Sequence, residues 1–256
     1  MAGRSVRERF GTVVFDCDST LSAIEGIDEL AGVHRDEVVR LTDAAMVGDV
    51  PLDEVYGRRL ALIQPTRAQL DAIGALYVEH LVPDARGVVR ALHEAGVRVC
   101  VMSGGLLPAV RTLAGALGIP ASDVVAVDIR FDGTDLYAGF DDGSPLARSG
   151  GKYEVMMRWR ASLPAPIMLV GDGATDLEAS PAVDLFVAFA GVADRAVVTV
   201  AADVVIRARS LAPVLPRALG GRAPGDRAAR MLYDRGLALL DPHVRQHLTS
   251  HESPRQ

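Results

Sequence analysis

Two aspartates, Asp16 and Asp18, directly follow a short apolar run at residues 13–15. Two carboxylates at this spacing, at the mouth of a parallel sheet, can share a hard cation, and one of them can attack phosphorus as a nucleophile. Turns are also rich in aspartate, so the pair alone fits an ordinary turn. A phosphoryl-transfer site is therefore indicated only if complementary groups follow other strands.

Polar groups of a complementary kind follow a second apolar run, residues 97–102. Ser103 offers a hydroxyl there, and Gly104 offers a backbone amide that a ligand can approach closely. Such groups suit phosphate oxygens, above all where a helix begins next. A serine with glycines after a strand also makes an ordinary turn. This run too depends on its neighbours for a functional meaning.

More acids follow a third apolar run, residues 167–170, on a turn that should open a helix. They are Asp172 and Asp176, and Lys152 lies earlier, before a helical segment. The lysine could neutralise charge on a transferring phosphoryl group. Alone, each group would be an ordinary loop acid or surface lysine. Because the carboxyl ends of parallel strands form one edge of a sheet, we expect the acids to converge there.

Short apolar runs and helical patterns alternate along the elements that must hold these groups. The alternation predicts an α/β fold with a doubly wound, mostly parallel sheet covered on both faces. Asp84 is expected to cap a crossover helix that stops at Gly96. The predicted strands are residues 13–15, 97–102, 124–127, 167–170, 185–187 and 204–206.

One long segment, residues 21–82, breaks the alternation because it shows helical patterns and no convincing strand. Pro51 can open one helix, and Thr66 with Gln69 forms the pattern of a capping box for another. Placed straight after the first strand, the segment would lie over the carboxyl ends of the strands, where open α/β sheets bind ligands. We expect a small helical cap that could act as a lid.

Two further segments depart from the alternation. Asp132 and Gly133 divide two strand-like arms within residues 128–140, which predicts a β-hairpin. Residues 220–225 resemble a linker, and residues 226–240 look helical. The predicted domains are therefore a core of residues 1–20 and 83–221, a cap of residues 21–82, and a C-terminal helical extension with a polar tail, residues 222–256.

The predicted C-terminal helix has an apolar side. Such a side more often packs on the core of its own chain than binds a partner, although a dimer contact is an alternative. The apolar residues are Met231, Leu232, Leu237, Leu239 and Leu240.

Taken together, the polar groups resemble the four motifs of the haloacid dehalogenase (HAD) superfamily. The motifs lie at residues 16–20, 103–105, 152 and 171–176. Within this superfamily the chain is similar to the phosphoserine phosphatase family, on residues 25–30, 59–65, 138–140 and 149–152. The resemblance runs in order through about residues 12–206, so it rests on several motifs. It implies a HAD-like Rossmannoid core with a helical cap.

The resemblance implies a division of labour among the acids. Asp16 would be the nucleophile, and Asp18 would protonate the leaving alcohol and then activate water. The cofactor would be Mg²⁺, held by the carboxylates of Asp16 and Asp172 and by the backbone carbonyl of Asp18. The cation would offset the repulsion between an anionic nucleophile and an anionic ester.

The resemblance also implies which groups hold the phosphate. Ser103, Gly104 and Lys152 would bind oxygens whose charge shifts during transfer. Thr175 would contact the substrate and, with Asp176 in support, position the attacking water and the loop.

In the cap, the resemblance implies that Glu25 meets the ammonium of the substrate, that Arg59 meets its carboxylate, and that Met46 lines the pocket. An arginine fork suits a carboxylate, and a desolvated acid suits an ammonium. The implied reaction is hydrolysis of O-phospho-L-serine to L-serine and phosphate, a step of serine biosynthesis. Two residues depart from the family pattern: Val47 stands where Gly is usual, and Leu52 stands where Phe is usual. Both could reshape the apolar wall beside the substrate.

Composition excludes several other classes of protein. The 256 residues carry a formal net charge of −6, so a basic face for sequence-independent nucleic-acid binding is not expected. The longest apolar run, residues 185–193, is far below the roughly 18 residues that cross a bilayer. The two cysteines, Cys17 and Cys100, give no disulfide framework. We expect a cytoplasmic protein, monomeric or homodimeric, with a small-molecule substrate and no membrane or nucleic-acid partner.

Three alternatives stay open at this point. The chain could be a phosphatase for another small phosphorylated metabolite, or a transferase that passes the phosphoryl group from Asp16 to an alcohol. A non-catalytic binding protein is the third, because fold does not fix function. The set of acids with Ser103 and Lys152 argues against the last.

Overall fold

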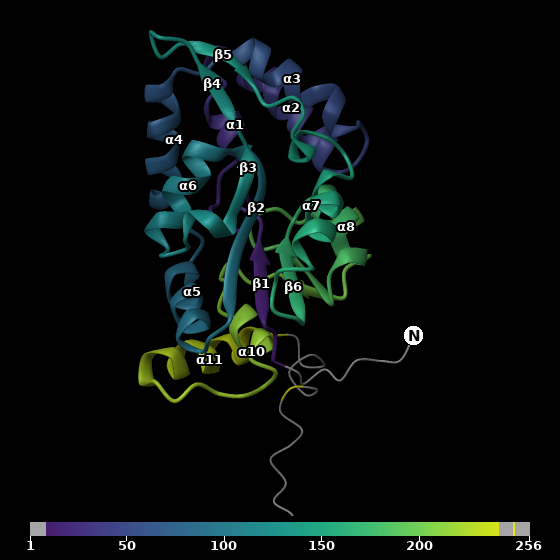
Figure 1. Cartoon of the computed structure of the whole chain (residues 1–256). Coiled ribbons are helices and arrows are strands. Elements are labelled where there is room, and N and C mark those ends of the chain that lie inside the picture. Colours follow the sequence, from purple (N-terminus) through teal and green to yellow (C-terminus); the bar gives the residue numbers. More distant parts are fainter. Residues whose placement is uncertain (1–8, 241–247, 249–256) are drawn as a thin grey trace, which may run out of the picture.

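A six-stranded sheet, parallel throughout, forms the centre of the computed structural model, which describes residues 9–240 and 248 (Figure 1). The strand order is β3-β2-β1-β6-β7-β8. The strands are β1 (Thr12–Phe15), β2 (Arg98–Leu106), β3 (Val124–Val127), β6 (Ile167–Gly171), β7 (Leu185–Phe189) and β8 (Val204–Ile206). All six predicted strands are confirmed, and so is the α/β class.

Strand β1 has neighbours on both sides, since Phe15 pairs in register with Val101 of β2 and with Val170 of β6. All four residues of β1 are buried, as expected where helices cover both faces of a sheet. The strand order reverses between β1 and β6. Ligands bind at such switch points, beyond the carboxyl ends of the strands.

Helices cover both faces of the sheet, with α5 and α6 on one side and α7 and α8 on the other (Figure 1). The helices of the core are α5 (Ala85–Glu94), α6 (Leu107–Ala116), α7 (Gly151–Trp159), α8 (Ala174–Ala179), α9 (Ala196–Thr199), α10 (Val214–Ala218) and α11 (Arg227–Leu239). None of the helices within residues 9–240 is both long enough and apolar enough to cross a membrane.

Between β1 and α5 the chain forms helices, as predicted. They are α1 (Gly26–Glu29), α2 (Arg35–Met46), α3 (Leu52–Ile63) and α4 (Arg67–Glu79). Pro51 immediately precedes α3, and the capping box of Thr66 and Gln69 is present at the start of α4. Helices α2 and α3 lie above the carboxyl ends of the strands (Figure 1), together with the predicted hairpin, β4 (Ile129–Phe131) and β5 (Tyr137–Phe140).

Two local predictions were wrong in part. The chain does not turn directly after Met102, because β2 continues through an irregularity in its pairing to Leu106 before α6 begins. Asp84 stands at the start of α5, but its side chain does not cap the helix; it accepts a hydrogen bond from Ser210 Oγ at 2.6 Å. Its positive φ of 70° turns the carboxylate away from the first helical amides.

Helix α11 packs on α5 and α10, at the end of the sheet away from the cap (Figure 1). Its predicted apolar side was wrong in part, because Met231 and Leu239 are exposed. The buried positions Ala229, Tyr233 and Gly236 follow the helical spacing of three and four residues. The tail beyond residue 240, apart from Leu248, and residues 1–8 lie outside the described part of the chain.

Two helical glycines give a matched test of this packing. A Cβ at Gly236 in α11 would lie 2.3 Å from the carbonyl oxygen of Ala212, whereas a Cβ at Gly115 in α6 would meet nothing within 4 Å. We expect Gly236→Ala to lower the free energy of unfolding by about 1–3 kcal/mol through overpacking. Gly115→Ala should raise it by about 0.5–1 kcal/mol, because alanine loses less backbone entropy. Urea unfolding of both variants measures this, and a stabilised Gly236→Ala would contradict the packing.

Candidate active site

Asp16 lies at the centre of the site because β1 ends one residue before it. Its backbone N–H donates to Val170 O at 2.9 Å and so extends the pairing of β1 with β6. The carboxylate is buried, and its Oδ1 accepts a hydrogen bond from the Cys17 N–H at 2.8 Å. The fold thus holds this carboxylate at a fixed place beyond the sheet.

Lys152 contacts Asp16 and Asp176 at once. Its Nζ lies 3.0 Å from Asp16 Oδ1 and 2.7 Å from Asp176 Oδ1. Burial alone would lower the pKa of the lysine, but the two carboxylates outweigh it and raise that pKa. The lysine is the second residue of α7, within the helix rather than before it as predicted. It therefore stays charged beside the candidate nucleophile.

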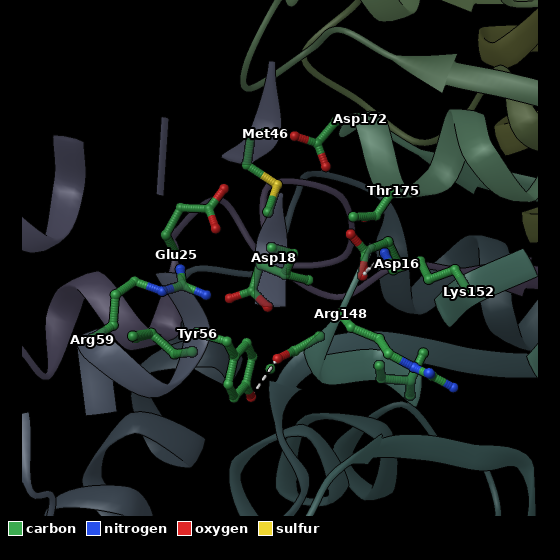
Figure 2. Close-up of a pocket in the computed structure, with 15 residues that line it drawn as sticks. Asp16, Asp18, Glu25, Met46, Tyr56, Arg59, Arg148, Lys152, Asp172 and Thr175 are labelled. Atoms are coloured by element: carbon green, nitrogen blue, oxygen red, sulfur yellow. Dashed lines mark hydrogen bonds and ion pairs between the residues drawn. The ribbon is translucent and has the colours of Figure 1, made fainter. Parts of the chain in front are cut away.

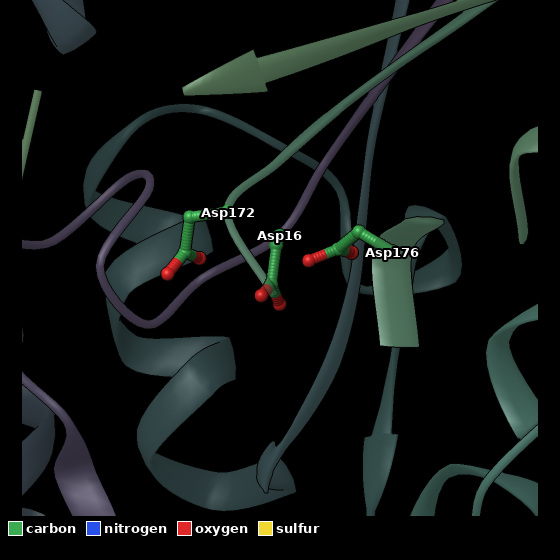
Figure 3. A group of neighbouring side chains, drawn as sticks. All are labelled: Asp16, Asp172 and Asp176. Atoms are coloured by element: carbon green, nitrogen blue, oxygen red, sulfur yellow. The ribbon is translucent and has the colours of Figure 1, made fainter. Parts of the chain in front are cut away.

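Asp16, Asp172 and Asp176 form a cluster of buried carboxylates in which one oxygen from each residue lies within 4.8 Å of one oxygen from each of the others. Asp16 lies between the other two (Figure 3). Asp172 follows β6, and Asp176 lies in the first turn of α8 and accepts a hydrogen bond from the Gly173 N–H at 3.1 Å. Buried carboxylate oxygens are the donors that hard divalent cations take, so these residues fit a metal ion such as Mg²⁺.

The side chain of Asp18 points away from this cluster. Its Oδ1 accepts hydrogen bonds from the Gly26 N–H at 2.7 Å and from Tyr77 OH at 2.5 Å, and its Oδ2 accepts one from Ser103 Oγ at 3.3 Å. Burial, followed by repulsion from Glu25 and Asp16, raises the pKa of Asp18 to about 7. A carboxyl group with such a pKa can give and take a proton near neutral pH.

Ser103 lies behind Asp18 rather than in the pocket wall. Its hydroxyl donates to Asp18, and its oxygen accepts from the Gly105 N–H at 2.9 Å. Gly104, in contrast, lines the pocket. The role of Ser103 in binding phosphate stays a prediction.

One pocket brings together most of the predicted residues (Figure 2). In this view Glu25 and Arg59 lie on one side of Asp18, and Lys152 lies on the other. Predicted residues that line it are Asp16, Asp18, Glu25, Met46, Arg59, Gly104, Lys152, Asp172 and Thr175. Of the two departures from the family pattern, Leu52 also lines the pocket, whereas Val47 is not among the lining residues and is partly exposed.

Arg59 is a buried arginine in the pocket wall. Its Nη1 donates to Thr42 Oγ1 at 2.9 Å, and its guanidinium carbon lies 5.3 Å from the ring centre of Tyr56. Its Nε has no hydrogen-bond partner among the described residues. Since a buried donor without a partner is unfavourable, an anionic ligand group would stabilise this position.

Arg195 is a residue of the site that sequence reasoning missed. Its guanidinium pairs with Asp172 through Nη1 and lies 3.4 Å from Glu25 Oε1 through Nη2. The side chain is only 10% exposed. Arg195 thus bridges a predicted metal ligand and a predicted substrate ligand. Nothing in its local sequence marked it, since it stands in an irregular stretch before the short helix α9.

The bridge predicts a dependence of stability on metal. Arg195→Met would leave Asp172 and Glu25 without this cation, and losing one partner of a buried pair costs about 3 kcal/mol. In a chain of this size the melting temperature without metal should fall by about 6–12 °C. Added Mg²⁺ should raise the melting temperature of the variant by more than it raises that of wild type. Thermal unfolding with and without Mg²⁺ measures both effects.

Arg207→Met is the matched control, because Arg207 is 60% exposed and pairs with Asp194 at 3.5 Å. Its melting temperature should barely change, as expected for a surface ion pair. Equal responses of the two variants to metal would contradict the bridging role of Arg195.

Comparisons with known proteins agree with this geometry. The family model of haloacid dehalogenase-like hydrolases matches residues 10–184. The chain is 43% identical to the phosphoserine phosphatase of Homo sapiens over 182 residues, which are 70% of this chain and 81% of the relative. It is 44% identical to that of Bos taurus over 183 residues, with the same coverage of each chain.

A solved structure gives the same fold. A phosphoserine phosphohydrolase-like protein from Francisella tularensis superposes with a TM-score of 0.71, covering 77% of this chain and 95% of that one, at 22% identity. With a family model that matches most of its length, the chain belongs to the haloacid dehalogenase-like hydrolases.

Proposed function

We propose that this chain is a Mg²⁺-dependent phosphoserine phosphatase, which hydrolyses O-phospho-L-serine to L-serine and phosphate. The observation that carries the proposal is a single pocket lined both by Asp16 of the carboxylate cluster and by Arg59, whose Nε is unpaired. Arg59 lies on the same side of Asp18 as Glu25 (Figure 2). The 43% identity to the human phosphoserine phosphatase supports the same substrate.

In the first step Asp16 attacks the phosphorus of the substrate. Within the described residues, the polar contacts of its carboxylate, from the Cys17 N–H and from Lys152 Nζ, fall on Oδ1, so we assign the attack to Oδ2. The new bond joins Oδ2 to phosphorus, and the bond from phosphorus to the seryl oxygen breaks. Asp18, in its neutral form, gives its proton to the departing alcohol.

In the second step water attacks the phosphorus of the aspartyl phosphate. Asp18, now ionised, accepts a proton from that water, and the bond from phosphorus to Asp16 breaks. Phosphate leaves, and both aspartates return to their starting states. A pKa raised to about 7 by burial suits Asp18 to both roles.

The cation would be held by the carboxylates of Asp16 and Asp172 and by the backbone carbonyl of Asp18. When bound, it supplies positive charge that offsets the repulsion between the nucleophile and the ester. Asp176 supports the site by pairing with Lys152 through Oδ1 and by accepting the Gly173 N–H through Oδ2. The phosphate oxygens are bound by Lys152, Ser103, the Gly104 backbone and Thr175.

The cap selects the amino-acid part of the substrate. The unpaired Nε–H of Arg59 donates a hydrogen bond to the carboxylate of the substrate, and the carboxylate of Glu25 accepts one from the ammonium group of the substrate. Glu25 is held in place by Ser19 Oγ, which donates to its Oε1 at 2.7 Å, while Met46 and Leu52 add apolar wall. A zwitterion is thereby favoured over a plain alkyl phosphate.

Residues 21–82 act as a cap domain that closes over the site and excludes bulk water. The two connections of the cap run side by side, since the Ala23 N–H donates to His80 O at 2.8 Å and the Val82 N–H donates to Leu21 O at 2.9 Å. This paired connection joins the cap to the core, and α4 of the cap also packs along α6 of the core.

The cellular setting belongs to the same proposal. The buried free thiols of Cys17 and Cys100 fit a reducing compartment, so we place the protein in the cytoplasm, in serine biosynthesis. It acts as a monomer or homodimer.

Substrate comparison tests the proposal. We expect kcat/KM to fall in the order phosphoserine, phosphothreonine, phosphocholine, since phosphocholine lacks the carboxylate that Arg59 binds. Arg59→Ala should lower kcat/KM for phosphoserine about 100-fold, the loss of a charged hydrogen-bonded contact. Its effect on phosphocholine should be within about threefold, because that substrate does not use the lost contact.

Arg58→Ala is the matched control, since Arg58 is the neighbouring arginine of α3, is 60% exposed and pairs with Glu37. It should leave the order of substrates and their rates unchanged, and Asp16→Asn provides the blank without nucleophile. A preference for phosphocholine would point to another metabolite. Phosphate release that requires added alcohol would identify a transferase.

A further inference from the structure

The two carboxylate oxygens of Asp18 have unlike surroundings. Oδ1 accepts two short hydrogen bonds, from the Gly26 N–H at 2.7 Å and from Tyr77 OH at 2.5 Å. Among the described residues, Oδ2 has only the longer hydrogen bond from Ser103 Oγ at 3.3 Å. Both strong donors belong to the inserted helices α1 and α4, whereas Asp18 lies in the loop after β1.

Tyr77 is held rigidly where it makes this contact. Its side chain is 1% exposed, on a helix that packs along α6. The ring shares a small apolar pocket with Ile27, Leu106 and Ala109. Packing therefore fixes the phenol oxygen, and the hydrogen bond is not a chance contact of a mobile side chain.

Two glycines shape the space around Asp18. A Cβ at Gly26 would lie 2.1 Å from the phenol oxygen of Tyr77, so the amide and the phenol reach the same oxygen only because residue 26 has no side chain. A Cβ at Gly105 would lie 2.9 Å from Asp18 Oδ2. Both glycines are thus needed for the observed position of the carboxyl group.

We propose that Tyr77 is a positioning residue for Asp18: with the Gly26 amide it occupies Oδ1 and so assigns the transferred proton to Oδ2. The reason is one of donors and acceptors. A proton on Oδ1 would face the Gly26 N–H, which can only donate, or would force the Tyr77 hydroxyl to turn and give up its one hydrogen-bond acceptor among the described residues. A proton on Oδ2 leaves both hydrogen bonds intact. This inference rests on the proposed function, because it takes Asp18 as the acid of the reaction.

A series of aryl phosphates with leaving groups of graded acidity tests it, together with phosphoserine. Tyr77→Phe keeps the ring and removes only the hydroxyl. A basic leaving group needs the proton of Asp18, whereas p-nitrophenolate leaves without one. We expect kcat/KM of the variant to fall on the order of 10- to 100-fold for phosphoserine and unsubstituted phenyl phosphate, and within about threefold for p-nitrophenyl phosphate.

Tyr56→Phe is the control for losing a buried hydroxyl in the pocket wall, since Tyr56 OH donates its hydrogen bond to Gly104 O at 2.8 Å rather than to Asp18. It should leave the ratio of kcat/KM for phenyl phosphate to kcat/KM for p-nitrophenyl phosphate as in wild type. A Tyr77→Phe variant with that same unchanged ratio overturns the inference, while the proposed function stands. Wild-type protein that hydrolyses neither phosphoserine nor aryl phosphates overturns the proposed function itself.

Discussion

Lys152 pairs with two carboxylates at once, at 3.0 Å from Asp16 and 2.7 Å from Asp176, and all three side chains are buried. Burial removes water from both acids, and without the lysine charge between them the two carboxylates would also repel each other. The contact of Lys152 with Oδ1 of Asp16 also leaves Oδ2 of Asp16 as the oxygen that is free to react. Lys152 lies at the start of α7, where Gly151 allows close packing, because a Cβ at residue 151 would lie 1.6 Å from Pro145 O.

The proposed catalytic acids belong to the core, while the groups that align Asp18 and those proposed to receive the amino-acid part of the substrate belong to the inserted helical segment. Asp18 is where the two sets meet, with Tyr77 and Gly26 on one side and Ser103 on the other. Arg195 makes a second link, from Asp172 in the core to Glu25 beside α1. A shift of the inserted helices would therefore disturb proton transfer and substrate binding together.

Much of the fold could be predicted because the buried strands are short apolar runs and because acids at strand ends must meet at one edge of the sheet. Tyr77 and Arg195 could not be predicted in this way. A tyrosine in a half-buried helix and an arginine in an irregular stretch have no local signal, and their roles depend on contacts with residues 59 and 23 positions away. The buried side of α11 was also misplaced, since small residues such as Gly236 allow closer packing than leucines do.

The central claim is that the phosphoryl group passes through Asp16. Acid quenching during turnover of phosphoserine, followed by digestion and mass spectrometry, tests this claim most directly. The account predicts one added phosphoryl group on the peptide that contains Asp16, located at that residue and absent from Asp16→Asn. Steady hydrolysis of phosphoserine without any phosphorylated Asp16 would contradict it, and so would undiminished turnover by Asp16→Asn.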